Sequence, residues 1–212
     1  MSEKSSPFKI NGTLAIDLGS STTVVAFQPE GNDSTNLLEL KPISRAPGEV
    51  PSLIWQSPDD DEIILVGQEI ENLELKDKKT PFLISDFKRL IGTPKESQFE
   101  RNLMSPETAG ELLIRRIWEK IPSRFNVKRL VLTAPVETYK SYRKWLNTVC
   151  SDLDVAEIAL VDEPTAAAIG ANQKGGSKLL VIDIGGSTVD MSMVLIEGGE
   201  GHAEPIAQLL RF

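Results

Sequence analysis

Two short segments of the sequence place an aspartate, glycines and hydroxyl groups at the same spacing. Residues 14–22 read LAIDLGSST and residues 180–188 read LVIDIGGST, so that Asp17 and Asp183 occupy equivalent positions. In each copy an apolar run precedes the aspartate, and glycine, small residues and a threonine follow it. One such segment would also be consistent with an ordinary glycine hairpin, but two copies favour a shared chemical role.

The chemistry that such a segment supports is the binding of a phosphate group and its metal ion. Glycine permits a tight turn and lets a phosphate approach the backbone closely. Backbone N–H groups and hydroxyl groups at the turn donate hydrogen bonds to phosphate oxygens. An aspartate supplies negative charge for Mg²⁺, usually through water, because Mg²⁺ dehydrates reluctantly. Two such hairpins that face each other would hold the phosphates of a nucleotide from both sides.

The composition excludes several other kinds of site. The chain has 23 basic and 31 acidic residues and a net charge of -8, which argues against sequence-independent binding of nucleic acid. Its one cysteine, Cys150, excludes an internal disulfide and a cysteine-rich zinc site. Its one histidine, His202, excludes a site with several histidines. A Ser-His-Asp or Cys-His hydrolase would need His202, which we predict to lie in the polar turn 198–202.

No part of the sequence predicts a membrane segment. No run reaches the roughly 18 consecutive apolar residues that a membrane-spanning helix needs. The N-terminus, MSEKSSPFKING, lacks the apolar run of a signal peptide. We therefore expect a cytoplasmic protein.

The first part of the chain predicts a meander of strands that carries the first aspartate. Apolar and β-branched runs predict strands at 13–17, 22–27 and 37–40, with Asp17 at the end of the first. Residues 42–104 differ, because six prolines and an acidic run interrupt them. We interpret this region as a smaller inserted subdomain, with short strands at 52–55 and 63–66.

The remainder of the sequence alternates between helix and strand patterns. Ser105, Pro106 and Glu107 have the residue types of a helix start, and Pro122 is expected to end that helix. The patterns that follow predict strands at 129–134, 155–161, 179–184, 188–196 and 204–210, with helices over 139–149 and 164–171. Helices that alternate with strands after an initial meander indicate an α/β fold with a mixed sheet.

Four further motifs carry a resemblance to a known family. They are VDEPTAAAI at 161–169, FKRLIG at 87–92, the segment Asp183–Asp190, and LTAP at 132–135 with Arg143 eight residues after Pro135. Together, and in their order along the chain, they resemble motifs of the nucleotide-binding domain of the heat-shock protein 70 chaperones, which belong to the actin-like ATPase superfamily. The resemblance runs from about Thr13 to about Glu197. It implies a ribonuclease H-like/actin-like ATPase fold, with a mixed sheet and flanking helices.

The resemblance also implies catalytic roles for individual residues. Asp17 and Asp183 would hold the water shell of Mg²⁺. Lys88 would lie beside the γ-phosphate and position or activate the attacking water. Glu163 and Asp190 would order that water and the metal. These roles agree with phosphoryl transfer, in which positioning and charge neutralisation supply most of the catalysis.

The same resemblance implies a phosphate cradle. The hydroxyl groups of Ser20 and Thr188 would bond the γ-phosphate. The cradle would be formed by Gly19, Ser20, Ser21, Thr22, Gly185, Gly186, Ser187 and Thr188. Ser187 stands where the family has a third glycine, and a left-handed backbone there would cost about 1 kcal/mol or more. The family's Arg-Thr-Thr-Pro-Ser segment is replaced at 48–52, a change that we interpret as affecting the inserted subdomain and not the phosphates.

The resemblance implies a division of the chain into two lobes. Residues 13–176 would form the first lobe, with the inserted subdomain at about 42–104, and residues 177–212 would form the first strands of a second lobe. The chain would then be the N-terminal fragment of a longer protein. The fragment alone is expected to bind Mg·ATP weakly and to hydrolyse it negligibly. Strands 179–210 would be mobile or would cover their apolar side chains with a second copy of the chain.

The function that the resemblance implies is that of an ATP-driven chaperone. The complete protein would bind ATP or ADP with Mg²⁺, hydrolyse ATP, and act with client polypeptides and co-chaperones. One alternative is an actin-like scaffold or interaction module without catalysis. A weaker alternative is a sugar or acetate kinase of the same superfold, against which the segment EPTAAA argues.

Overall fold

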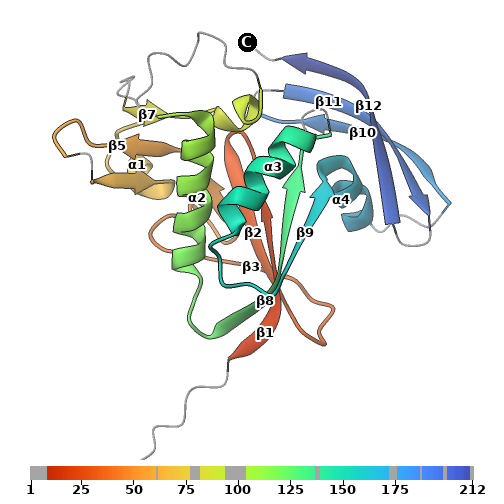
Figure 1. The fold of residues 1–212 in the computed structure, drawn as a ribbon, viewed down its shortest axis with the longest axis horizontal. Helices are drawn as coiled ribbons and strands as arrows, with labels where there is room; N and C mark the ends of the chain where they lie inside the picture. Colours follow the sequence, from red (N-terminus) through yellow and green to blue (C-terminus); the bar gives the residue numbers. More distant parts are fainter. Residues whose placement is uncertain are drawn as a thin grey trace, which may run out of the picture.

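The computed structural model describes residues 9–60, 62–76, 82–93, 104–136, 139–171, 176–186, 188–197 and 200–210. A central sheet lies between two smaller sheets, and helices cover the central sheet (Figure 1). The expected α/β class, with a mixed sheet and flanking helices, is confirmed. None of the helices in the described ranges has the length and apolarity needed to cross a bilayer.

The central sheet sets the first aspartate at one edge. Its strands are β1 (Ile10–Asp17), β2 (Thr22–Pro29), β3 (Asn36–Leu37), β4 (Glu49–Pro51), β8 (Phe125–Ala134) and β9 (Glu157–Asp162). The order is β3-β2-β1-β8-β9, and β4 also pairs with β2. β1 is antiparallel to β2 but parallel to β8, and β8 is parallel to β9, so the sheet is mixed. Parallel strands end at the same edge, which therefore carries Asp17, Ala134 and Asp162.

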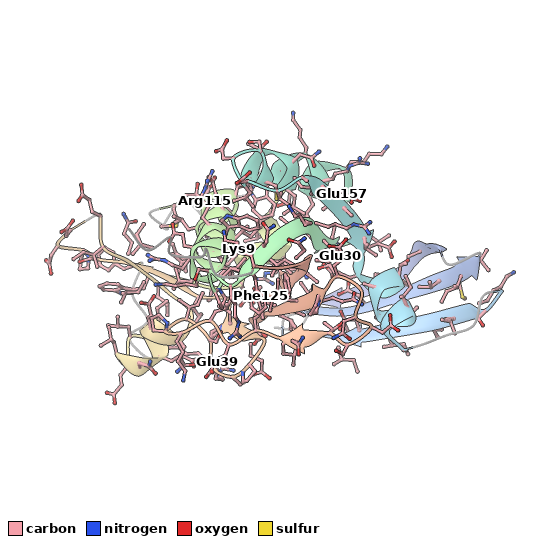
Figure 2. The ribbon with its side chains drawn as sticks, turned by 90° about the horizontal axis from the view of Figure 1, so that it is seen from below. Lys9, Glu30, Glu39, Arg115, Phe125 and Glu157 are labelled. Carbon is pink, nitrogen blue, oxygen red and sulfur yellow. The ribbon has the colours of Figure 1, made fainter. Side chains whose placement is uncertain are left out.

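Two helices cover one face of this sheet. They are α2 (Pro106–Lys120) and α3 (Tyr139–Cys150), which cross the sheet in Figure 1. Ser105 caps α2 as predicted, because its hydroxyl accepts a hydrogen bond from the N–H of Thr108 at 3.1 Å. The core between the layers includes Leu14, Ile16, Phe27, Leu113, Ile117, Leu130, Leu132 and Leu146, all buried. At the opposite edge from Asp17, the rings of Phe27 and Phe125 lie 4.3 Å apart (Phe125 is labelled in Figure 2).

The stretch 42–104 contributes to two sheets. One is a small sheet with the order β6-β5-β7, made of β5 (Ile54–Gln56), β6 (Ile64–Val66) and β7 (Leu83–Ile84). Helix α1 (Gln68–Asn72) lies between β6 and β7 in the chain, and the short helix η1 (Phe87–Leu90) follows β7. Strand β4 was not expected, and it belongs to the central sheet because it pairs with β2 from Thr22 to Val24. The predicted strand at 52–55 corresponds to β5, which begins two residues later at Ile54, and Ser52 lies between β4 and β5.

The last three strands form a separate sheet in the order β10-β11-β12. They are β10 (Lys178–Ile184), β11 (Thr188–Glu197) and β12 (Glu200–Leu210), and α4 (Glu163–Gly170) packs on one face (Figure 1). Ala168 of α4 packs with Val194 and Ile196. The expectation that His202 lies in a polar turn is wrong: the β11–β12 ladder extends to Glu197 and Glu200, so His202 pairs with Leu195.

Candidate functional site

The two aspartate hairpins meet in the structure. The first is the turn between β1 and β2, and the second is the turn between β10 and β11. A Cβ atom on Gly186 would lie 2.9 Å from the hydroxyl oxygen of Ser21 and 3.0 Å from its Cβ. The second turn therefore packs against the first, and a side chain at Gly186 would push the two turns apart. Segments with the same sequence pattern thus form two sides of one site.

The first turn is tight and presents unbonded N–H groups. A Cβ on Gly19 would collide with the carbonyl oxygen of Thr22, so glycine is required at this position. The carbonyl groups of Gly19 and Ser21 accept hydrogen bonds from Ser52. No group in the described ranges accepts a hydrogen bond from the N–H of Ser20 or Ser21. The carbonyl oxygens of the turn are therefore hydrogen-bonded within the protein, and its N–H groups are available to bind an anion.

Ser52 fixes this turn, which corrects one sequence-based interpretation. Its hydroxyl donates to the Gly19 carbonyl at 2.7 Å, and its N–H donates to the Ser21 carbonyl at 2.9 Å. Its oxygen also lies 2.9 Å from the hydroxyl of Thr23, and both side chains are buried. The segment 48–52, which we interpreted as belonging only to the inserted subdomain, therefore also supports the phosphate turn, through Ser52. The signal was the Pro51-Ser52 pair, which the family's segment also contains.

Thr133 orients the first aspartate and was missed in the sequence. It lies on β8, which runs parallel to β1, and its hydroxyl donates to Oδ1 of Asp17 at 2.5 Å. Asp17 itself is exposed, so its other oxygen can face a ligand. The motif at 132–135 contained this threonine, but only the pairing of β1 with β8 shows which carboxylate it contacts.

An ion pair joins two segments that are distant in the sequence. Nζ of Lys88 lies 2.8 Å from Oε1 of Glu163, and the two side chains are 13% and 21% exposed. Lys88 follows the fully buried Phe87 in η1, which anchors this turn in the core. Glu163 begins α4, whose N-cap Asp162 accepts a hydrogen bond from the Thr165 N–H at 2.8 Å. Both ends of the ion pair are thus held by the fold.

Electrostatic effects place this ion pair beside both aspartates. Burial raises the pKa of Glu163 above its ordinary value, and the nearby positive charge of Lys88 opposes that rise. The negative charges of Asp17 and Asp183 raise the pKa of Glu163 further, so both lie close to it. Glu163 therefore lies within electrostatic range of three other predicted catalytic residues, Lys88, Asp17 and Asp183.

The second turn engages the fifth residue, Asp190. Oγ1 of Thr188 donates to Oδ2 of Asp190 at 2.7 Å, and the N–H of Gly185 donates to the Thr188 carbonyl at 2.9 Å. Asp190 also pairs with Asp183 across the β10–β11 ladder. Thr188 would have to break its hydrogen bond to Asp190 before its hydroxyl could donate one to a phosphate. Ser187, a predicted cradle residue, lies outside the described residues.

The arrangement of carboxylates fits a metal ion held through water. In the described ranges, no three acidic, histidine or cysteine side chains gather closely enough to ligate an ion directly. Asp17 and Asp183 are both exposed at the turns, where they can accept hydrogen bonds from metal-bound water. Mg²⁺ commonly keeps several waters and uses one or two carboxylates together with substrate phosphates. The residues present therefore fit Mg²⁺ bound with a nucleotide.

Tyr142 is a second residue that the sequence did not identify as part of the site. Its side chain is fully buried on α3, and its hydroxyl has no hydrogen-bond partner among the described residues. Burial raises its pKa well above the ordinary value, and the charges of Glu163 and Asp17 add to this effect. The sequence pattern predicted only the helix over 139–149 that contains Tyr142.

A hollow of about 460 Å³ lies elsewhere and does not overlap this site. Its lining includes Gly12 and Thr13 at the start of β1, at the opposite end of that strand from Asp17. Glu30 and Glu157, both labelled in Figure 2, also line it, as do Lys128 and Arg129 and several turn residues. Mixed charges of this kind do not favour an anionic ligand such as a nucleotide.

Comparisons with known proteins agree with the motifs. Residues 101–200 match the MreB/Mbl protein family. The chain is 29% identical to Chaperone protein DnaK of Thermosipho melanesiensis over 202 residues, and 26% identical to that of Thermotoga petrophila over 201 residues. It is 28% identical to Chaperone protein DnaK of Mycoplasmopsis agalactiae over 199 residues.

These matches cover 92% of this chain in each of the three relatives, but only 31% or 32% of the relatives themselves. The chain thus spans about a third of the length of the curated relatives it matches. The matches confirm the resemblance to the heat-shock protein 70 chaperones and to actin-like ATPases.

Proposed function

We propose that this chain, which resembles the heat-shock protein 70 chaperones along nearly its whole length, supplies the phosphate-binding and catalytic side of an Mg²⁺-dependent ATPase. The observation that carries the proposal is the meeting of the two aspartate hairpins at the Lys88–Glu163 ion pair. Neither the repeat nor the ion pair alone would indicate hydrolysis. Together they place phosphate donors, metal-binding charge and a water-positioning pair in one site.

Each group has a distinct role in the proposed reaction. The turns at Gly19–Thr22 and Gly185–Thr188 bind the phosphates, and Asp17 and Asp183 accept hydrogen bonds from the waters of Mg²⁺. The metal, when bound, neutralises charge on the phosphates. Lys88 lies beside the γ-phosphate, and Glu163 accepts a hydrogen bond from the attacking water. The water oxygen forms a bond to the γ-phosphorus while the bond from that phosphorus to the ADP oxygen breaks, and the water hydrogens leave with the inorganic phosphate.

The wider function proposed for the complete protein is that of a chaperone. The names of the relatives support it, because the relatives described above are chaperones of the DnaK type. Client polypeptides and co-chaperones are then the proposed partners. We further propose that residues 13–176 form the first lobe of the ATPase domain and that residues from 177 onward begin the second.

Nucleotide binding and hydrolysis by the complete gene product test this proposal. Isothermal titration calorimetry should show binding of ATP that requires Mg²⁺, and single-turnover assays should show release of phosphate. Binding without phosphate release would favour a scaffold that retained the fold. Absence of nucleotide binding in the presence of Mg²⁺ would reject both the ATPase and the nucleotide-binding scaffold.

We also propose that the 212-residue chain pairs with a second copy through the outer face of β10. Leu180, Ile182 and Ile184 alternate along this strand and are 51%, 53% and 62% exposed. β10 is the edge strand of its sheet in the described part of the chain. Apolar side chains beside an open strand edge favour association, and a two-fold pair would bury the same face of both copies.

Light scattering tests the pairing. The chain is expected to be a dimer, and Ile182→Lys is expected to make it monomeric, because it places a charge in the middle of the shared face. Leu73→Lys is the matched control, since Leu73 is 58% exposed and follows α1, away from this sheet. A monodisperse monomer of the unmodified chain would contradict the proposal.

A further inference from the structure

Tyr142 is a buried hydroxyl that the proposed mechanism does not use. Its side chain is 0% exposed, and its ring packs edge-on against Trp145 with the ring centroids 5.1 Å apart. The hydroxyl has no hydrogen-bond partner within the part of the chain that the structure describes. Burial of an unbonded polar group is costly, so each case in a native protein calls for an explanation.

The surroundings of this hydroxyl are acidic. Helix α3, which carries Tyr142, packs against β8 and β9, and Glu163 follows directly after β9 in the chain. The charges of Glu163 and Asp17 accordingly act on the Tyr142 phenol. A phenol can donate a hydrogen bond and an ionised carboxylate can only accept one, so the groups are complementary. Lys88 is the cation in this cluster, at 2.8 Å from Glu163, and Asp183 is the other charged group that acts on Glu163.

Asp17 and Glu163 differ in the hydrogen bonds and ion pairs that their carboxylates already make. Asp17 accepts a hydrogen bond from the hydroxyl of Thr133 and is exposed toward the phosphate turns. Among the described residues Glu163 is held by Lys88 alone, through an ion pair at Oε1 that leaves this oxygen without a well-directed hydrogen bond, and its side chain is 21% exposed and lies deeper in the protein. Within the described ranges, Glu163 is therefore a carboxylate that lacks a second donor, and Tyr142 is, with Thr165, one of two buried hydroxyl groups without a hydrogen-bond partner.

We propose that Tyr142 is a positioning residue for Glu163: when nucleotide fills the site, its hydroxyl donates a hydrogen bond to the Glu163 carboxylate. Lys88 and Tyr142 then hold this carboxylate from two sides and fix the direction in which it accepts from the attacking water. Hydrogen bonds of this kind are often unmade in ligand-free sites and form when substrate binds. The role of nucleotide rests on the proposed function, whereas the proximity of Tyr142 to Glu163 does not.

The proximity is tested first, by NMR on the 212-residue chain. The chain contains two tyrosines, Tyr139 and Tyr142, so labelling tyrosine at the ζ carbon with ¹³C gives two resonances, which Tyr139→Phe assigns. Without ligand, Glu163→Gln is expected to shift the resonance assigned to Tyr142. A Tyr142 resonance that does not respond to Glu163→Gln would overturn the inference, whether or not the protein hydrolyses ATP.

The positioning role is tested with Tyr142→Phe, which removes one oxygen and keeps the ring. In the complete gene product, single-turnover hydrolysis is expected to fall about tenfold while the Kd for Mg·ATP changes less than about twofold. The melting temperature is expected not to fall, because the hydroxyl that is lost was unbonded. Tyr139→Phe, the same substitution three residues earlier in α3, is measured in parallel.

Two results of this second experiment would overturn the inference. An unchanged rate in Tyr142→Phe would show that the hydroxyl does not act on Glu163. A lowered melting temperature would show that the hydroxyl has a structural partner in the ligand-free protein. If the unmodified protein binds no nucleotide, the proposed function fails, and the ligand-free NMR comparison still decides whether Tyr142 faces Glu163.

Discussion

Lys88→Ala is expected to lower the single-turnover rate of ATP hydrolysis by about 100-fold or more, with the Kd for Mg·ATP changed less than about threefold. Lys88 pairs with Glu163, on which the charges of Asp17 and Asp183 also act, so its own charge can stabilise the transferring phosphoryl group and hold the water-positioning carboxylate. A group that acts on the transition state more than on the bound substrate affects the rate and not the affinity.

Arg89→Ala is the control for this variant. Arg89 is the next residue of η1, it is exposed, and its removal deletes the same charge from the same short helix. Its hydrolysis rate should match that of the unmodified protein. An unchanged rate in Lys88→Ala would assign the protein to the non-catalytic scaffold alternative, provided that nucleotide still binds.

The same substitution should also change stability in a pH-dependent way. Removal of Lys88 leaves the buried Glu163 carboxylate unpaired, which we expect to cost about 2 kcal/mol at pH 7, less than for a fully buried pair. The pKa of Glu163 is already raised by burial, and loss of the cation raises it further. Because the folded pKa then exceeds the unfolded value, ionised Glu163 disfavours folding above its folded pKa. The destabilisation should therefore shrink as pH falls through that pKa.

Asp183→Asn is expected to weaken Mg²⁺-dependent nucleotide binding by about 10- to 100-fold. The substitution keeps the shape and one acceptor oxygen of the side chain but removes its negative charge. Asp183 lies at the end of β10, at the turn that packs against Ser21, so its charge acts where metal-bound water would lie. Nucleotide binding measured with a chelator in place of Mg²⁺ should change far less, because the lost interaction is with the metal.

Calorimetry with and without Mg²⁺ measures this effect. Asp154→Asn is the control, because Asp154 is an exposed aspartate between α3 and β9, and its substitution should leave both affinities unchanged. Equal losses of affinity with and without Mg²⁺ in Asp183→Asn would contradict a role through the metal. They would indicate that the substitution disturbs the phosphate turn itself.

The sequence alone determined the local features on which the site depends. The repeated segment predicted both hairpins, because an apolar run that ends in aspartate and glycine specifies a buried strand followed by a tight turn. Helix α2 was predicted from its cap residue, since Ser105 and Pro106 satisfy the first turn of a helix through neighbouring atoms alone. Such features depend on neighbouring residues, so the sequence shows them directly.

Only the tertiary structure decided which groups meet. Strand β4 joins the central sheet and carries Ser52 to the first turn, although the prolines around it indicated a separate insertion. Thr133 reaches Asp17 because β8 pairs with β1. Tyr142 comes within electrostatic range of Glu163 because α3 packs against β8 and β9. Strand order and helix packing are set by the burial of whole faces. That burial sums small contributions from residues far apart in the chain, so no local pattern records it.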